Sequence, residues 1–136
     1  MQVFDRHLSD SDKTPKVTFE NEDMRIFKET HCSHEIRTAE KLSRHGIRCC
    51  FVNDNVQELD RNGKPTGRSL NYADLDNGME IKVLNSASSY NTINGHLKNA
   101  SKKLNATSVV FDNSENKCLT DEKLAEYLRR SQAFKY

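Results

Sequence analysis

The sequence lacks any long apolar run, and this absence limits where the protein can reside. No stretch of the chain approaches the ~20 consecutive apolar residues that a membrane-spanning helix needs. The opening segment MQVFDRHLSD is charged from its fifth residue and so does not resemble a signal peptide. We therefore expect no membrane span. If the domain is exported, its export signal belongs to a larger parent chain.

An excess of charge of one sign is also missing. The chain carries 21 basic and 20 acidic side chains, which gives a formal net charge of +1. A polyanion would therefore meet no global attractive field, and a nucleic-acid ligand would need a local basic face. The 136 residues suit one domain, and a chain of this length can bury a core without metal or disulfide staples.

The cysteines form no CxxC pair. Two of the four are adjacent and would point to opposite faces of a strand. We interpret the set as free thiols in reducing surroundings. The alternative is a zinc site from His31, Cys32, His34 and one distant cysteine, although this spacing matches no common zinc pattern. The cysteines are Cys32, Cys49, Cys50 and Cys118.

The spacing of apolar residues and turn residues predicts the order of elements. Residues 1–16 are interpreted as a flexible lead-in or linker, and residues 17–136 as one domain. The clearest helix is 33–45, where Ser33 can cap the start and Gly46 can end it. Segment 17–29 is ambiguous between strand and helix. The other expected elements are strands at 47–53, 79–85 and 107–112, a turn or hairpin tip in 54–69, and helices at 91–104 and 120–133.

This order favours an α/β (α+β) fold with a central mixed β-sheet flanked by helices. A strand–helix–strand unit near the end of the chain requires a crossover, and the helix of a crossover packs on the sheet. The buried stripe of the 91–104 helix would contain Ile93, Leu97, Ala100 and Leu104.

Three acidic residues and one lysine are the candidate catalytic residues. Asp74 and Glu80 flank an Asn77-Gly78 turn, and a hairpin there would bring their side chains together. Glu80 and Lys82 are two apart in a strand and therefore share a face. Glu35 lies in the first turns of the 33–45 helix.

Such a set suits phosphodiester chemistry. Neighbouring carboxylates can hold a divalent metal that activates water and binds phosphate oxygens, so Asp74 and Glu80 are candidate ligands for Mg²⁺ or Mn²⁺. A lysine on the same face can neutralise charge that develops on the phosphate. The alternative is a mechanism without a metal, in which the lysine and a neighbouring hydroxyl group stabilise the phosphate. The ordinary alternative for Glu-x-Lys is a solvated ion pair.

Three segments together resemble the PD-(D/E)xK nuclease superfamily. They are HEIRTAEKLSRHGIRCCFVNDN, YADLDNGMEIK, and TSVVFDN after an intervening helix. More narrowly, the chain is similar to the tRNA-cleaving C-terminal domains of contact-dependent growth inhibition toxins. The similarity covers roughly residues 31 to 113 and implies a PD-(D/E)xK nuclease-like core.

The resemblance implies roles for individual residues. The family's helical glutamate corresponds to Glu35, with Glu40 as the rival. Its hairpin aspartate corresponds to Asp74, or to Asp76 if the register differs by two. Its ExK pair corresponds to Glu80 and Lys82. The glutamine that many members carry in the next helix is absent, which weakens a DNase assignment more than an RNase assignment.

The 91–104 helix supplies the candidate nucleic-acid-binding residues. Three lysines and a histidine could line a phosphate groove beside the sheet, and the histidine could act as a general acid or base. A solvated helix face is the alternative. The four residues are His96, Lys98, Lys102 and Lys103.

Taken together, the residues and the resemblance imply a bacterial toxin nuclease that hydrolyses phosphodiester bonds, in tRNA by family likeness. The resemblance further implies delivery from a larger secreted or cell-surface parent into the target-cell cytoplasm. It also implies a cognate immunity protein as partner. A metal-dependent DNase and a non-catalytic binding domain of the same fold are the alternatives.

Overall fold

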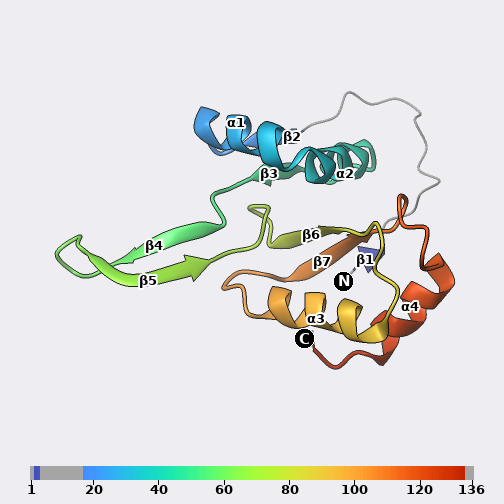
Figure 1. Cartoon of the computed structure of the whole chain (residues 1–136). Coiled ribbons are helices and arrows are strands. Elements are labelled where there is room, and N and C mark those ends of the chain that lie inside the picture. Colours follow the sequence, from blue (N-terminus) through green and yellow to red (C-terminus); the bar gives the residue numbers. More distant parts are fainter. Residues whose placement is uncertain (1, 4–16, 134–136) are drawn as a thin grey trace.

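The computed structural model describes residues 2–3 and 17–133, and it combines α-helices with small β-sheets (Figure 1). The helices are α1 (Glu22–His31), α2 (Ser33–Arg44), α3 (Tyr90–Ser101) and α4 (Asp121–Arg130). The strands are β1 (Gln2–Val3), β2 (Val17–Phe19), β3 (Cys49–Phe51), β4 (Asn55–Leu59), β5 (Pro65–Asn71), β6 (Met79–Val83) and β7 (Ser108–Asp112). The predicted α+β fold class is confirmed, and the PD-(D/E)xK-like core stays a prediction.

The strands form three small sheets. β1, β7 and β6 make a three-stranded parallel sheet with β7 in the middle, β2 pairs with β3 in parallel, and β4 pairs with β5 in antiparallel. Parallel neighbours need a crossover, which α3 supplies between β6 and β7. The predicted lead-in at 1–16 lies outside the described residues, apart from β1.

The β6–β7 sheet lies between two helical layers, as Figure 1 shows. Val109 and Phe111 alternate with Val110 along β7, so their side chains face opposite layers. The α3–α4 side buries a cluster that includes Leu84, Ile93, Leu97, Val109, Phe111, Leu124 and Leu128. The α2 side buries Ala39, Leu42, Cys49, Phe51, Leu75, Ile81 and Val110. β6 therefore lies at an edge of the sheet with a core on each side.

Most of the predicted elements are confirmed, and the ambiguous segment contains both structures. Residues 17–29 divide into β2 and the first part of α1, and the side chain of Asn21 caps that helix by accepting from the amide of Met24. The predicted cap of the last helix also forms, because Thr120 accepts from the amide of Lys123 at 3.2 Å.

The hairpin expected around Asn77-Gly78 is present but short, because the amide of Leu75 donates to the carbonyl of Met79 at 3.1 Å across the turn. The Asp74–Asp76 segment also bonds to β3, through Val52 N to Asp74 O at 3.1 Å and Asp76 N to Cys50 O at 3.0 Å. The tight turn itself is present, because the amide of Gly78 donates to the carbonyl of Leu75 at 3.0 Å. The segment thus joins β3 to the start of β6, and this position places Asp74 between the two sheets.

A second correction concerns the 91–104 helix. α3 ends at Ser101, so Leu104 lies beyond it with 62% of its surface exposed and does not belong to the buried stripe. Ile93, Leu97 and Ala100 are fully buried, as predicted.

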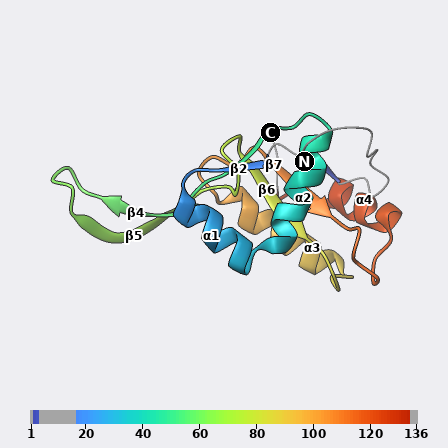
Figure 2. The same ribbon diagram turned by 90° about the horizontal axis from the view of Figure 1, so that it is seen from above.

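The β4–β5 hairpin projects from the body of the molecule (Figures 1 and 2). Its residues are almost all exposed, and the segment predicted as a hairpin tip forms this longer structure. Among the described residues, none of the helices has the length and hydropathy of a membrane span.

Candidate functional site

Lys28 joins two of the three predicted carboxylates. It lies in the last turn of α1 and is only 3% exposed. Its ammonium nitrogen lies 3.2 Å from Glu35 Oε1 and 3.9 Å from Asp74 Oδ1. The same nitrogen lies 5.1 Å from the centre of the Phe51 ring, a cation–π distance. A buried ammonium needs such partners, so this lysine fixes the loop of Asp74 against the start of α2.

Asp74 and Glu80 are in direct contact, as the sequence predicted. The amide of Asp74 donates to Glu80 Oε1 at 3.1 Å. Asp74 Oδ2 in turn accepts from the amide of Ile81 at 2.8 Å. Ile81 lies in edge strand β6, so the carboxylate of Asp74 binds an amide that no neighbouring strand satisfies. Asp76, the alternative to Asp74, is exposed.

Glu80 pairs with a different lysine, Lys103. Lys103, just beyond α3, places its nitrogen 3.4 Å from Glu80 Oε2. Glu80 is 2% exposed, so its carboxylate is buried and Lys103 balances its charge. The three carboxylates therefore form one connected series, Glu35–Lys28–Asp74–Glu80–Lys103.

Burial perturbs the protonation of this series. Burial, followed by repulsion from Glu80, raises the pKa of Asp74 to about 7. Burial and the Asp74 carboxylate also raise the pKa of Glu35, although Lys28 opposes the shift. For Lys28, burial alone would lower the pKa, but Glu35 and Asp74 outweigh it and raise it. Lys28 thus remains cationic, and the Asp74 carboxyl titrates near neutral pH.

Glu35 and Lys82 face a common cavity of about 510 Å³ beside β6. The walls come from α1, α2, β6 and α3, together with the loops that follow β6 and β7. The lining residues are His31, Cys32, His34, Glu35, Ile81, Lys82, Val83, Asn85, His96 and Glu115. Asp74 and Glu80 do not line this cavity; they lie behind it and are almost completely buried.

Lys82 differs from the two lysines behind the cavity. Among the described residues, no hydrogen bond or ion pair involves its ammonium group, whereas Lys28 and Lys103 both contact carboxylates. Burial, and then the charge of Lys82, lower the pKa of His96, whose ring faces the same cavity. Lys82 therefore offers a free cation to an anionic ligand, and His96 is neutral beside it.

The four predicted nucleic-acid-binding residues do not all line the cavity. His96 faces the cavity, and Lys103 pairs with Glu80 instead of solvent. Lys98 is exposed. It lies about 200° around the axis of α3 from His96, because each residue advances the helix by about 100°. Lys102 is the C-cap of α3 and is exposed. Of the four, only His96 lines the cavity, and a role of these residues in binding nucleic acid stays a prediction.

The oxygens of Asp74 and Glu80 already have partners, which bears on the predicted metal site. Two accept from the amides of Ile81 and Asp74, and the other two face Lys28 and Lys103. Within residues 2–3 and 17–133, no three His, Cys, Asp or Glu side chains are grouped so that they could hold a metal ion. With these oxygens engaged, Asp74 and Glu80 do not form a ready ligand set for Mg²⁺. The metal requirement itself stays a prediction.

The alternative zinc site is not assembled either. His34 Nδ1 lies 3.4 Å from Glu115 Oε2 and 2.5 Å from Arg37 Nη2, and His31 packs on the ring of Phe27. Burial and the nearby Glu35 raise the pKa of the Cys32 thiol, which disfavours the thiolate that zinc binds.

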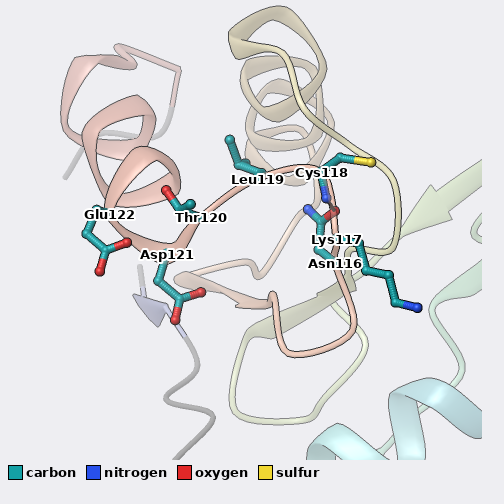
Figure 3. Close-up of a pocket in the computed structure, with 7 residues that line it drawn as sticks. All are labelled: Asn116, Lys117, Cys118, Leu119, Thr120, Asp121 and Glu122. Atoms are coloured by element: carbon teal, nitrogen blue, oxygen red, sulfur yellow. Dashed lines mark hydrogen bonds between the residues drawn. The ribbon is translucent and has the colours of Figure 1, made fainter.

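A second hollow of about 500 Å³ lies at residues 116–122, before and at the start of α4 (Figure 3). Its polar side chains serve the local fold. Asn116 donates to Ala87 O at 2.9 Å, and Thr120 caps α4. None of the predicted site residues lines it, so it is not the candidate site.

Lys28 is the site residue that sequence reasoning missed. A usable signal was present, because Lys28 follows Met24 by four residues and so shares the helical stripe that packs on the core. A lysine on a buried stripe requires an anionic partner.

Comparison with known proteins adds no relative: no family model, curated protein or solved structure matches the chain.

Proposed function

We propose that this chain is the nuclease domain of a bacterial toxin and cleaves phosphodiester bonds, with tRNA as its substrate. The observation that carries the proposal is the free ammonium group of Lys82, which shares a cavity with the carboxyl group of Glu35. An ammonium group suits the negative charge that develops on a phosphate, and a carboxyl group of raised pKa suits proton transfer.

The buried residues have a supporting role in this proposal. Lys28 holds Glu35, and the Asp74–Glu80 contact holds the first residues of β6, from which Lys82 projects. A site whose charged groups are fixed in advance needs less reorganisation during reaction. The resemblance to the PD-(D/E)xK superfamily supports the same residues, and the choice of tRNA rests on that resemblance.

The biological setting follows from the same resemblance. The domain would be delivered from a larger secreted or cell-surface parent into the cytoplasm of the target cell. A cognate immunity protein would bind it, and an acidic surface on that protein would complement Lys82.

The test is cleavage by the purified chain of tRNA and of plasmid DNA, each with and without EDTA. Cleavage of tRNA that Lys82→Met and Glu35→Gln each abolish supports the proposal. Lys123→Met and Glu126→Gln are the matched controls, because these residues pair with each other on the surface of α4, and both should retain activity. Cleavage of plasmid alone would identify a DNase, and EDTA sensitivity would establish the metal requirement. A folded chain that cleaves neither polymer would refute the proposal.

A further inference from the structure

The cavity brings together three groups with complementary protonation properties. Lys82 extends from β6, Glu35 from α2 and His96 from α3, and all three line the same space. They come from three different elements, so the cavity exists only in the folded chain. Within the described part of the chain, none of the three bonds to another, and all three border the cavity of about 510 Å³.

His96 is available for proton transfer. Among the described residues, no hydrogen bond involves its imidazole, and its one ring contact is with Phe111 at 6.5 Å between centroids. The other two histidines of the cavity are engaged, His34 with Glu115 and Arg37, and His31 with Phe27. Burial and Lys82 keep His96 neutral, so its free ring nitrogen can accept a proton.

Glu35 is suited to the opposite role. Its side chain is 28% exposed and reaches both the cavity and the buried Lys28. Burial and Asp74 raise its pKa, although Lys28 opposes the shift, and a carboxyl group of raised pKa is a better proton donor than an ordinary one. A base, an acid and a cation that line one cavity suit phosphoryl transfer in which the substrate supplies the nucleophile.

We propose that the cavity cleaves RNA by internal transphosphorylation, with His96 as the general base, Glu35 as the general acid and Lys82 as the group that binds the phosphate. This inference rests on the proposed nuclease function and specifies its substrate class and products. The 2′-hydroxyl attacks the adjacent phosphorus while His96 takes its proton. The bond from phosphorus to the 5′-oxygen breaks, and Glu35 gives that oxygen a proton. The products are a 2′,3′-cyclic phosphate and a 5′-hydroxyl.

The two proton transfers need no further reactant. One proton passes to His96 and one leaves Glu35, so a later exchange with water restores both groups. The reaction needs a 2′-hydroxyl and therefore excludes DNA as a substrate. This chemistry also agrees with Asp74 and Glu80 being engaged by amides and ammonium groups behind the cavity.

The decisive experiment analyses the ends that the purified chain produces from tRNA in the presence of EDTA. We expect 5′-hydroxyl ends that polynucleotide kinase labels without prior phosphatase treatment, and 3′ ends that resist phosphatase until acid opens the cyclic phosphate. A synthetic RNA carrying one 2′-deoxynucleotide on the 5′ side of the mapped bond should not be cut. Fragments with 5′-phosphate ends would overturn the inference but leave the nuclease proposal intact. Cleavage of tRNA that occurs only without EDTA would also overturn the inference alone. Absence of cleavage of any nucleic acid, both with and without EDTA, would refute both proposals.

The role of His96 has its own test. His96→Ala should lower the cleavage rate by about 100-fold or more, the usual contribution of a general base, while circular dichroism shows an unchanged fold. Added imidazole should restore part of the activity, because the substitution opens space in an accessible cavity. A purely structural role would show no such rescue. Activity of His96→Ala equal to that of Lys123→Met would remove His96 from the mechanism.

Discussion

The carboxylate of Asp74 accepts a hydrogen bond from the amide of Ile81 at 2.8 Å, and a side chain thereby completes the outer edge of strand β6. The amide of Asp74 is in turn held by Glu80, one residue before Ile81. These reciprocal bonds fix the Asp74 loop against the strand that carries Lys82. The geometry of the proposed site consequently depends on residues that never touch the cavity.

Replacing Lys28 by methionine should weaken this arrangement. The substitution keeps an apolar side chain of similar length but leaves Glu35 and Asp74 without their shared cation. We expect the free energy of unfolding to fall by about 2–4 kcal/mol, somewhat below the cost for a fully buried pair because Glu35 is partly exposed. Urea denaturation measures this change.

A double variant separates charge from packing at the same position. If the loss comes from unpaired carboxylates, the double variant Lys28→Met/Asp74→Asn should lose less free energy of unfolding than the sum of the losses of the two single variants. Lys123→Met, an exposed lysine on α4, should leave the denaturation midpoint almost unchanged. Additive effects of the two substitutions would show that the ion pair contributes little.

The pH dependence of stability should reveal the perturbed carboxyl of Asp74. Its folded pKa of about 7 lies above the ordinary value of 3.8, so between these values the folded state binds the additional proton. Stability from this group is therefore fully present at low pH and is lost as pH rises through 7. Asp74→Asn cannot lose a proton, so its stability relative to the native chain should increase as pH rises.

Thermal melts of both proteins across this pH range provide the measurement. The difference between their melting temperatures should change steadily below the folded pKa and level off above it. A difference that does not depend on pH would show that the carboxyl has an ordinary pKa in the folded protein.

The sequence predicted the parts of the site that depend on local rules. The 33–45 helix could be identified because its apolar residues recur at helical spacing, and this helix placed Glu35 correctly. The contact between Asp74 and Glu80 followed from the Asn77-Gly78 turn between them, although the Asp74 segment also bonds to β3. Short-range geometry thus predicted the contact, and the bonds to β3 were the part that it could not predict.

The remaining features depend on contacts between distant segments. Nothing near Lys103 in the sequence indicates that it pairs with Glu80, because the contact requires the whole β6–α3–β7 crossover. Lys28 lies in a segment whose strand and helix portions could not be separated, so its buried stripe was not recognised. The cavity that unites Glu35 and His96 likewise exists only after α2 and α3 have packed around β6.

Gly78 should tolerate no side chain. Its φ of +88° lies in the left-handed region, and an added Cβ would lie 2.6 Å from Thr107 Oγ1 and 2.7 Å from Asn105 O. Gly78→Ala should therefore lower the free energy of unfolding by about 1–3 kcal/mol. The matched control is Gly95→Ala within α3, where a Cβ meets nothing within 4 Å, and this change should stabilise the chain by about 0.5–1 kcal/mol. Equal effects at the two positions would contradict the assigned turn geometry.

The helix that carries Glu35 is anchored by a buried hydrogen bond between Thr38 and Asp112. Thr38 Oγ1 donates to Asp112 Oδ2 at 2.6 Å, and Ser114 donates to the other carboxylate oxygen. Burial alone would raise the pKa of Asp112, but the hydrogen bonds from Ser114 and Thr38 outweigh it and lower the pKa. The stability that these bonds provide is therefore present above the unfolded pKa and is lost as pH falls through the lower, folded pKa.

Thr38→Val should remove the contribution of one such bond. The substitution preserves side-chain shape but leaves a buried carboxylate oxygen without its donor, and we expect a loss of about 1.5–3 kcal/mol at neutral pH. Thr38→Ser retains the hydroxyl group and should lose less. The deficit of Thr38→Val should shrink when the melts are repeated in acid, because protonated Asp112 gains less from the donor. A deficit that stays constant as the pH falls would assign the effect to packing in the helix and not to the bond with Asp112.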